Sequence, residues 1–262
     1  MKGVVLAGGL GSRLYPLTKV TNKHLLPIYD RPMVCYPMEC MRNAGVSEAM
    51  LVTGGASCGD FMQLLGDGSE FGFRSLVYAY QEGEGGIADA LRLAEGFAGG
   101  DRVMVVLGDN LIQGDVRASA DRFREQKAGA RILLKEVDDP ERFGVPELDD
   151  GKIVAIEEKP RVPKSRFAVT GIYFFDAEVF DFISALEPSA RGEYEISDVN
   201  NAYLRQGLLE HDVLQGWWTD AGTFDSLLRA NSLVAETGAN GRGLRASPAA
   251  GAETADTKRG DA

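Results

Sequence analysis

The chain of 262 residues has no long apolar run and only three cysteines. No apolar segment approaches the roughly 20 residues that a membrane-spanning helix needs, and the first apolar run, residues 4–7, is too short for a signal peptide. Cys35, Cys40 and Cys58 are odd in number and lack the spacing of metal ligands. This usage indicates free thiols, packed as small apolar residues in a reducing compartment. We therefore expect a cytoplasmic protein without a membrane partner.

The chain also has little positive charge. It has 28 Lys and Arg residues against 39 Asp and Glu residues, a net charge of −11, which argues against a nucleic-acid or anionic-membrane partner. Any site for a polyphosphate must therefore be a local basic pocket on an acidic surface. Hydrophobic residues make up 44% of the chain, which is enough for a large core in one α/β domain or in two small ones.

Strand-like apolar runs alternate with helical patterns in the first half of the chain. This alternation is typical of a mainly parallel central sheet that is flanked by helices on both faces. After residue 130 the strands come closer together, which predicts a smaller part with a mixed sheet. The expected strands are residues 3–7, 49–53, 75–80, 102–107, 130–137, 152–157, 167–175, 208–214 and 217–219, and the expected helices are residues 37–44, 60–65, 87–97, 116–126, 177–185, 196–205 and 223–236.

A change of composition divides the chain near its end. We expect residues 1–236 to form a single domain with two halves, residues 1–128 and 129–236. Residues 237–262 are rich in Gly, Ala, Asp, Thr and Arg and have almost no large apolar side chains. Because such a segment cannot bury enough apolar surface to offset chain entropy, it is predicted to be a disordered and dispensable tail.

A glycine-rich turn after the first expected strand is the strongest functional signal. Residues 8–11 include three glycines, whose backbone N–H groups can approach a phosphate, and Arg13 and Lys23 add the charge that a polyphosphate needs. A P-loop is excluded because no Gly-Lys-Ser/Thr follows the glycines. Leu14 stands where the third glycine of a dinucleotide fingerprint belongs, which disfavours a Rossmann oxidoreductase.

Further motifs extend this signal along the chain in a recognisable order. They are Gly8-Gly9-Leu10-Gly11-Ser12-Arg13-Leu14 with Lys23-His24-Leu25-Leu26-Pro27, Leu107-Gly108-Asp109-Asn110, Glu157-Glu158-Lys159-Pro160, Val169-Thr170-Gly171-Ile172-Tyr173, Gly192-Glu193-Tyr194-Glu195-Ile196-Ser197-Asp198-Val199 and Asp220-Ala221-Gly222-Thr223. The chain resembles the sugar-1-phosphate nucleotidyltransferases over residues 1–236. The resemblance implies a Rossmann-like nucleotidyltransferase fold of the α/β class, in which the first half binds the nucleotide and the second half binds the sugar phosphate.

The implied reaction joins a nucleotidyl group to glucose 1-phosphate. The sugar phosphate attacks the α-phosphorus of dTTP or UTP, and pyrophosphate leaves. Because both reactants are anions, the protein must align them and neutralise charge rather than supply a covalent nucleophile. The resemblance assigns catalytic roles to Arg13, Lys23, Asp109 and Lys159, and nucleotide contacts to Leu6, Gly8, Gly9, Gly11, Ser12, Arg13, His24, Gln81, Gly86 and Asp109.

Two aspartates, Asp109 and Asp220, follow expected strands. In the resembled family these positions hold Mg²⁺, an ion that suits two carboxylates combined with substrate phosphates. An aspartate after a strand also serves commonly as a turn residue or helix cap. The Gly-Asp-Asn and Asp-Ala-Gly-Thr surroundings favour the metal site, although Ala221 replaces a threonine that the family often has.

The second half is expected to bind the sugar phosphate. Lys159 would hold its phosphate, and Glu158 would accept hydrogen bonds from its hydroxyl groups; an exposed ion pair is the structural alternative. Tyr173 fits a core aromatic residue as well as a ligand contact. The resemblance places the sugar pocket at Asn110, Gly144, Glu158, Lys159, Val169 and Tyr173.

Gln81 and Gly86 align with the positions that read the base. A glutamine amide offers a donor and an acceptor, which match the O4/N3–H edge of thymine or uracil, whereas a flipped amide would accept cytosine. Thymine and uracil differ by one methyl group, worth about 1 kcal/mol, so the choice between dTTP and UTP stays open. His24 replaces the glutamine that is usual after the lysine. It would either bond the nucleotide, with a pKa raised by the phosphates, or pack under the loop as a structural residue.

Other interpretations keep or lose the catalytic residues. Another hexose 1-phosphate, or CTP as the donor, would preserve the same chemistry. A non-catalytic sugar-nucleotide-binding module would be expected to lose at least one of four charged residues, and all four are present: Arg13, Lys23, Asp109 and Asp220. Members of the family are commonly homo-oligomers, so a homo-oligomer is expected.

Overall fold

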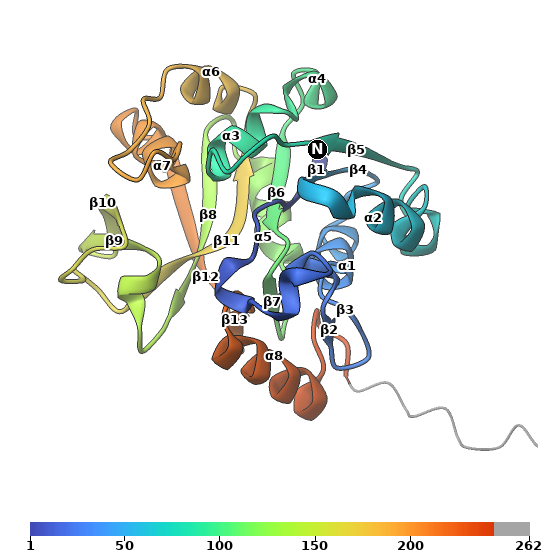
Figure 1. The fold of residues 1–262 in the computed structure, drawn as a ribbon. Coiled ribbons are helices and arrows are strands. Elements are labelled where there is room, and N and C mark those ends of the chain that lie inside the picture. The colour runs from blue at the N-terminus through green and yellow to red at the C-terminus, as the bar shows by residue number, and fades with distance from the viewer. Residues whose placement is uncertain (244–262) are drawn as a thin grey trace, which may run out of the picture.

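Four neighbouring parallel strands form one side of the main sheet (Figure 1). The computed structural model describes residues 1–243. β1 lies between β4 and β6, and β5 pairs with the outer side of β4. These strands are β1 (Lys2–Ala7), β4 (Glu48–Thr53), β5 (Ser75–Tyr80) and β6 (Val103–Leu107). Residues 3–7 of β1 are all buried, which explains why the sequence of this strand is a continuous apolar run.

Helices cover both faces of this sheet. The side chains of Val5 and Ala7 belong to a core shared with α1, α2 and α5, whereas Val4 and Leu6 belong to a core shared with α3, α4, α6 and α7. Alternate residues of β1 therefore point into two separate cores. The helices are α1 (Cys35–Asn43), α2 (Cys58–Leu65), α3 (Ile87–Arg92), α4 (Glu95–Ala98), α5 (Arg117–Glu125), α6 (Val179–Ser184) and α7 (Ile196–Arg205).

The second half of the chain adds antiparallel strands to the same sheet. β11 (Phe167–Phe175) runs antiparallel to β6 and to β8, so one nine-stranded sheet extends across both halves. The expected fold class, a mainly parallel sheet with a smaller mixed part, is confirmed. The other strands are β8 (Ala130–Glu136), β9 (Gly144–Asp149), β10 (Lys152–Glu158) and β12 (Leu209–Val213). β9 was not predicted, because Gly144 and Pro146 interrupt its apolar pattern.

A late strand returns to the first half of the chain. β13 (Trp218–Asp220) pairs antiparallel with β7 (Asn110–Ile112), a short strand that the sequence did not predict. In this pairing Asp220 lies opposite Asn110. The chain therefore brings Asp220 next to the loop that carries Asp109, although the two aspartates are far apart in the sequence.

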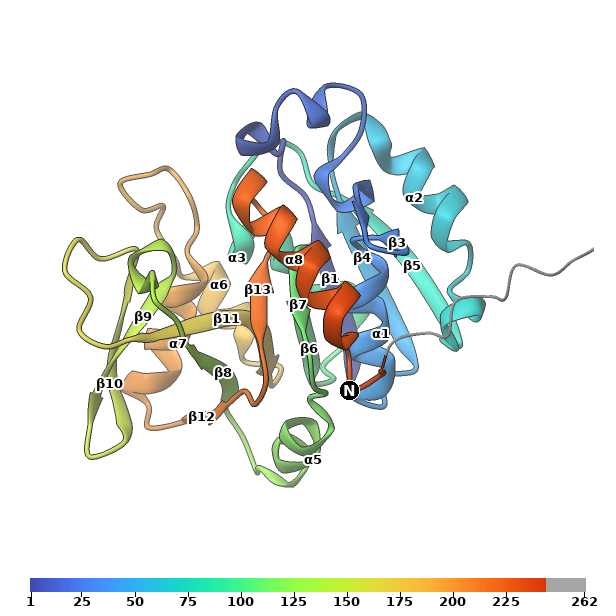
Figure 2. The same ribbon diagram turned by 90° about the horizontal axis from the view of Figure 1, so that it is seen from below.

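The helix after β13 secures this return. α8 (Phe224–Thr237) begins with a capping box in which Thr223 and Ser226 satisfy each other's backbone N–H groups. Figure 2 shows α8 beside β13, and the helix also packs on β2 (Pro27–Ile28), which forms a hairpin with β3 (Arg31–Pro32). A third core, separate from the two on the main sheet, lies under this helix.

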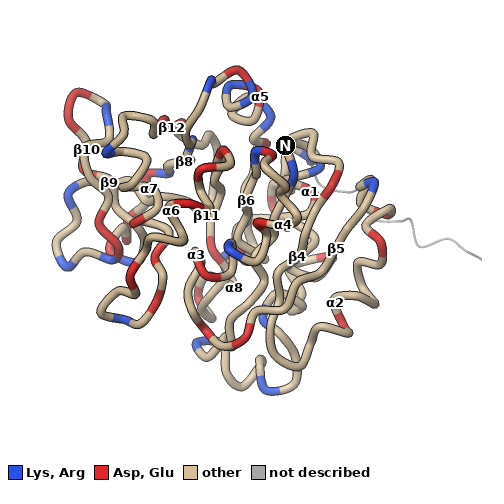
Figure 3. The backbone as a smooth tube through the Cα atoms, turned by 90° about the horizontal axis from the view of Figure 1, so that it is seen from above, with Lys and Arg blue, Asp and Glu red and all other residues tan. Residues whose placement is uncertain are grey.

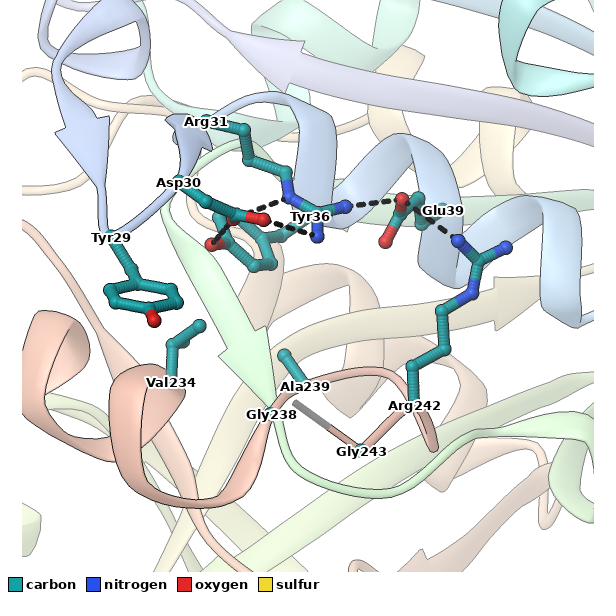
Figure 4. Close-up of a pocket in the computed structure, with 10 residues that line it drawn as sticks. All are labelled: Tyr29, Asp30, Arg31, Tyr36, Glu39, Val234, Gly238, Ala239, Arg242 and Gly243. Atoms are coloured by element: carbon teal, nitrogen blue, oxygen red, sulfur yellow. Dashed lines mark hydrogen bonds and ion pairs between the residues drawn. The ribbon is translucent and has the colours of Figure 1, made fainter. Parts of the chain in front are cut away.

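The described chain ends in a segment that docks on α1. Asn240 is buried, and its side chain donates a hydrogen bond of 3.0 Å to a backbone carbonyl of α1. Arg242 lies 3.3 Å from Glu39, which also pairs with Arg31 (Figure 4). The expected tail was to begin at residue 237, whereas this packing continues beyond it; residues 244–262 lie outside the described residues.

Short turns, free thiols and scattered charges complete the description. All three cysteines are free, as expected. Within residues 1–243, no helix combines the length and the apolar character that a membrane crossing requires. Basic and acidic residues are interspersed along the chain (Figure 3). The short 3₁₀ turns are η1 (Ser12–Leu14), η2 (Leu17–Lys19), η3 (Lys23–Leu25), η4 (Gly55–Ser57), η5 (Ser69–Phe71) and η6 (Pro140–Arg142).

Candidate active site

The glycine-rich loop and Asp109 lie at the same edge of the sheet. β1 ends at Ala7 and β6 ends at Leu107, and because these neighbours are parallel, their carboxyl ends meet. The loop after Ala7 passes through Gly9 and Gly11, whose φ angles are 87° and 63°. Residues with side chains rarely adopt such angles, so the glycines allow the backbone to turn sharply above the strand ends.

The residues that flank the glycines lie at two depths. Leu6 is buried at the end of β1, and its carbonyl accepts a hydrogen bond of 2.8 Å from the N–H of Gly108. Ser12 is exposed in η1. The hydroxyl of Thr18 donates to the carbonyl of Gly11 at 2.9 Å and so fixes the far side of the loop.

Lys23 and Asp109 form a largely buried ion pair. The Nζ atom of Lys23 donates to Oδ2 of Asp109 at 2.6 Å, and the two side chains are 15% and 13% exposed. Burial disfavours the charged carboxylate, but Lys23, His24 and Asn110 outweigh it and hold the pKa of Asp109 well below its usual range. Loss of Lys23 would leave a buried charge unpaired.

Three charged groups converge beside Gly222. A Cβ atom on this glycine would lie 3.1 Å from Oδ2 of Asp220, 3.2 Å from Nη2 of Arg13 and 3.6 Å from Oδ2 of Asp109. Arg13 comes from the glycine-rich loop, Asp109 from the turn after β6 and Asp220 from β13. The fold therefore brings together, around one point, residues from three separate motifs.

The negative charge of Asp220 is disfavoured by this arrangement. Burial and the charge of Asp109 raise the pKa of Asp220, while Arg142 opposes the rise. Nη2 of Arg142 donates to both oxygens of the Asp220 carboxylate, each at 3.1 Å. Two carboxylates held this close favour a cation between them. Within residues 1–243, no group of three or more His, Cys, Asp or Glu side chains is placed to hold a metal. Substrate oxygens would therefore have to complete the coordination of an ion here.

A cavity of about 370 Å³ lies against Asp220. Its wall combines Arg142 and Phe143, which precede β9, with Trp218 of β13 and Thr223 before α8. A second pocket, drawn in Figure 4, lies between the β2–β3 hairpin, α1 and the C-terminal segment. The larger cavity shares Asp220 with the convergence of charges and so extends the candidate site.

Asn110 connects the strands of the site. Its Nδ2 atom donates to Oδ1 of Asp109 at 3.0 Å, and its Oδ1 atom accepts from the N–H of Gly171 at 2.8 Å and from Nε1 of Trp218 at 2.7 Å. Both ends of the buried amide are thus engaged within the protein, and Asn110 orients Asp109. A contact of Asn110 with the sugar stays a prediction.

Three residues of the expected sugar pocket lie on adjacent strands. Gly144 pairs with both Glu158 and Val169, and a Cβ atom on Gly144 would lie 3.4 Å from Oε2 of Glu158. The glycine therefore leaves room beside the carboxylate. Tyr173 is buried further along β11, and burial, Glu158 and Asp109 raise the pKa of its hydroxyl, which stays protonated.

Lys159 has an unusual backbone conformation. Its φ is 47°, a left-handed value that costs a residue with a side chain roughly 1–2 kcal/mol. The N–H of Lys159 donates to the carbonyl of Phe143 at 2.9 Å, and Nζ lies 3.6 Å from Oε1 of Glu158. The side chain is 46% exposed, so the ammonium group is accessible to a ligand. Backbone strain of this kind clusters at functional sites.

Gln81 lies beneath the glycine-rich loop. The side chain is 6% exposed, and a Cβ atom on Gly8 would lie 2.8 Å from its Oε1 atom. Its Nε2 atom donates to Oδ2 of Asp89 at 3.0 Å and to the carbonyl of Gly86 at 3.3 Å. The structure therefore brings Gly8, Gln81 and Gly86 together, and their contact with a nucleotide stays a prediction.

His24 is buried under the same loop. It is 2% exposed, its Nδ1 atom lies 2.8 Å from Oδ1 of Asn22, and its ring packs so closely on Gly108 that a Cβ atom there would lie 2.7 Å from Cδ2. Burial and the charge of Lys23 lower the pKa of His24 to about 3. The shift is opposite to the rise expected beside phosphates, and the geometry fits the packing interpretation.

Sequence reasoning missed four charged residues: Glu84, Asp89, Arg142 and Arg191. Arg191 lies 3.5 Å from Glu158 and directly precedes one of the motifs, the only signal that pointed to it. Glu84 accepts a hydrogen bond of 2.8 Å from the N–H of Leu10 in the glycine-rich loop. Asp89 bonds to Gln81 and Arg142 bonds to Asp220, each far from its partner's motif or outside any motif. The sequence around Asp89 and around Arg142 therefore gives no indication of these contacts.

Comparison with known proteins gives close relatives. The profile of the nucleotidyl transferase family matches residues 2–237. The glucose-1-phosphate thymidylyltransferases of Neisseria meningitidis (serogroup A, serotype 4A) and Mycolicibacterium smegmatis are each 45% identical to this chain, over 238 and 237 residues. Each alignment covers 89% of this chain and 82% of the relative.

Solved structures have the same fold. A Bacillus anthracis protein, provisionally named a glucose-1-phosphate thymidylyltransferase and solved with a sucrose, is 52% identical; it superposes with a TM-score of 0.87 over 90% of this chain and 96% of its own. A UDP-glucose pyrophosphorylase complexed with UDP-glucose is 22% identical, with a TM-score of 0.76 over 88% of this chain and 97% of its own, which shows likeness of fold alone. The chain belongs to the nucleotidyl transferase family.

Proposed function

We propose that this protein transfers a thymidylyl group from dTTP to glucose 1-phosphate, which yields dTDP-glucose and pyrophosphate. The relatives at 45% identity that are named for this reaction support the proposal. UTP is the second candidate donor, since a single methyl group separates thymine from uracil. A cytoplasmic location and a homo-oligomeric assembly stay predictions from the sequence.

The observation that carries the proposal is the convergence beside Gly222. A cation, Arg13, and two carboxylates, Asp109 and Asp220, surround one point at the carboxyl edge of the parallel strands, and Lys23 is bonded to Asp109. This set of charges suits a triphosphate with a divalent ion. Direct transfer between two anions requires charge neutralisation and alignment of this kind rather than a covalent intermediate.

Asp109 and Asp220 fit Mg²⁺. Their Oδ2 atoms flank the same glycine, and the raised pKa of Asp220, caused by burial and by Asp109, reflects a repulsion that a bound cation would relieve. Two carboxylates leave room for waters and phosphate oxygens, which Mg²⁺ prefers to an all-protein cage. When bound, Mg²⁺ would neutralise charge on the α-phosphate.

Four side chains of the site would bind the substrates and neutralise their charge. A phosphate oxygen of glucose 1-phosphate forms a bond to the α-phosphorus of dTTP as the bond between that phosphorus and the departing pyrophosphate breaks. Arg13 would bind the β- and γ-phosphates and stabilise the departing pyrophosphate, and Lys23 would neutralise the α-phosphate. Lys159 would hold the sugar phosphate, and Glu158 would orient the sugar hydroxyls beside Gly144. Such preorganised charges commonly contribute about 3–4 kcal/mol each to transition-state stabilisation.

Formation of dTDP-glucose tests the proposal. Pyrophosphate release is measured with glucose 1-phosphate and Mg²⁺ for dTTP, UTP, CTP, ATP and GTP, and the sugar nucleotide is identified by mass spectrometry. We expect turnover with dTTP or UTP, much less with the other three, and none in excess EDTA. Preference for a purine nucleotide would contradict the base assignment, and undiminished turnover in EDTA would contradict the metal. Other hexose 1-phosphates in the same assay test the sugar.

A further inference from the structure

The amide of Gln81 has one orientation in the structure. Nε2 points to Oδ2 of Asp89 and to the carbonyl of Gly86, at 3.0 Å and 3.3 Å, and Oε1 faces the glycine-rich loop at Gly8. No residue among 1–243 donates a hydrogen bond to this Oε1 atom. The backbone N–H of Gln81 donates to the carbonyl of Thr53 at 2.7 Å, so the main chain is fixed as well.

Asp89 is the reason for this orientation. Its other oxygen, Oδ1, accepts a hydrogen bond of 2.7 Å from Nη2 of Arg92, and a carboxylate paired in this way can only accept. A flipped Gln81 would place Oε1 against the carboxylate and against the carbonyl of Gly86, two contacts between acceptors. Each of these contacts would leave a buried acceptor without a donor, which is unfavourable.

The loop around Asp89 is shaped for this contact. A Cβ atom on Gly85 would overlap with Oδ2 of Asp89, so only a glycine lets the carboxylate reach Gln81 in this position. Gly86 has a φ of 95°, and a Cβ atom there would lie 2.7 Å from the carbonyl of Tyr194. These two glycines allow α3 to start close enough for Asp89, in its first turn, to meet Gln81.

We propose that Asp89 is a positioning residue that sets the preference of the enzyme for thymine or uracil over cytosine. This inference rests on the proposed function. Asp89 holds the side-chain amide of Gln81 so that Oε1 of Gln81 faces the nucleotide. There, Oε1 accepts a hydrogen bond from the N3–H group of thymine or uracil. Cytosine presents an unprotonated N3, so in the same pose it would place an acceptor against this oxygen, and only the flipped amide that Asp89 disfavours could donate to that N3. Asp89 touches neither substrate and acts through Gln81.

Substitution of Asp89 tests this assignment through a ratio of rates. An asparagine at residue 89 can donate or accept, so D89N frees the amide of Gln81 to flip. We expect the ratio of kcat/KM for dTTP to that for dCTP to fall at least tenfold in D89N, and also in D89A, while KM for glucose 1-phosphate stays unchanged. The control R92Q removes the partner of Oδ1 but keeps the carboxylate, and its ratio should stay within twofold of the wild type.

The outcomes separate this inference from the proposed function. If kcat/KM falls by the same factor for dTTP and dCTP in D89N or D89A, their ratio is unchanged and Asp89 is only structural. If folded variants keep both values of kcat/KM, Asp89 has no role in base preference. Either result would overturn the assignment. If D89N does not fold, the ratio measured for D89A decides the matter. Wild-type protein that uses neither dTTP nor UTP would instead refute the proposed function, whatever the variants do.

Discussion

The proposed nucleotide side and the proposed sugar side of the site hold their polar groups differently. On the nucleotide side, Lys23 is bonded to Asp109 at 2.6 Å, both largely buried, and Gln81 is held by Asp89. On the sugar side, Lys159 is accessible and lies 3.6 Å from Glu158, beyond hydrogen-bond distance. The Lys23–Asp109 pair is neutralised within the protein before any ligand binds, whereas Lys159 presents an accessible cation on a constrained backbone.

This difference separates the effects of mutations. A buried, paired charge contributes to the fold as well as to chemistry, because removal of one partner leaves the other unpaired at low dielectric. An accessible charge whose partner lies beyond hydrogen-bond distance contributes little to the stability of the fold, so its removal mainly weakens ligand binding. Substitutions on the two sides should therefore differ in kind as well as in size.

The largest effect is expected from Lys23→Ala. Turnover should fall on the order of 10²–10³-fold, because a preorganised charge at the α-phosphate is lost, and the melting temperature should fall because Asp109 becomes a buried unpaired charge. Lys19→Ala removes an exposed lysine four residues earlier and is the matched control. Normal turnover and stability in Lys23→Ala would erase the distinction between the two sides.

A smaller effect should separate the two ligands. Lys159→Ala is expected to weaken binding of glucose 1-phosphate by about thirtyfold and of dTTP by less than twofold, with no loss of stability, whereas Arg13→Ala should mainly weaken dTTP. Isothermal titration of each variant with each ligand measures this. Lys164→Ala, a change of an exposed lysine, is the control. Equal losses for both ligands in both variants would refute the division of the site.

The smallest effect concerns stability and pH on the nucleotide side. His24 has a pKa of about 3 when folded and an ordinary value of 6.5, so the unfolded chain binds an extra proton between these values. The contribution of neutral His24 to stability is therefore present above pH 6.5 and is lost as the pH falls. By pH 5 the loss is about 2 kcal/mol, since one pH unit corresponds to about 1.4 kcal/mol.

Urea unfolding of the wild type and of His24→Gln between pH 8 and pH 5 measures this contribution. The variant should be less stable at pH 8, because the ring no longer packs on Gly108, but its stability should depend less on pH. Parallel curves for the two proteins would show that His24 is not held neutral by burial, and nucleotide binding would then be the better explanation of its position.

Much of the fold and the contiguous motifs could be predicted from the sequence. The glycine-rich turn is encoded locally, because residues 8–11 need backbone freedom and follow a buried apolar strand. The position of Asp109 at a strand end was predictable because it follows the apolar run of β6, whereas its role as a metal ligand came from the resemblance. The pairing of β7 with β13 was not predictable, because each strand has only three residues, too few to show a period.

What the sequence could not provide are the partners of the predicted residues. Arg142 binds Asp220, and Asp89 binds Gln81, through contacts that exist only once the strands and loops are packed. The burial of His24 in η3 likewise depends on Gly108, which follows β6 and is far from His24 in the sequence. Sequence motifs identify groups that meet a ligand, whereas the residues that orient those groups are specified by tertiary packing.

The most direct test of the account is the substitution Gly222→Ala. The added Cβ atom would lie within 3.6 Å of Asp220, Arg13 and Asp109, in the space where a metal-bound triphosphate is proposed to react, and Gly59→Ala adds the same atom to open space in α2. Turnover with dTTP and glucose 1-phosphate is measured together with the melting temperature. The account predicts that Gly222→Ala loses at least 100-fold in turnover while remaining folded, and that Gly59→Ala keeps full activity. Full turnover in folded Gly222→Ala would contradict the placement of the reaction at this convergence.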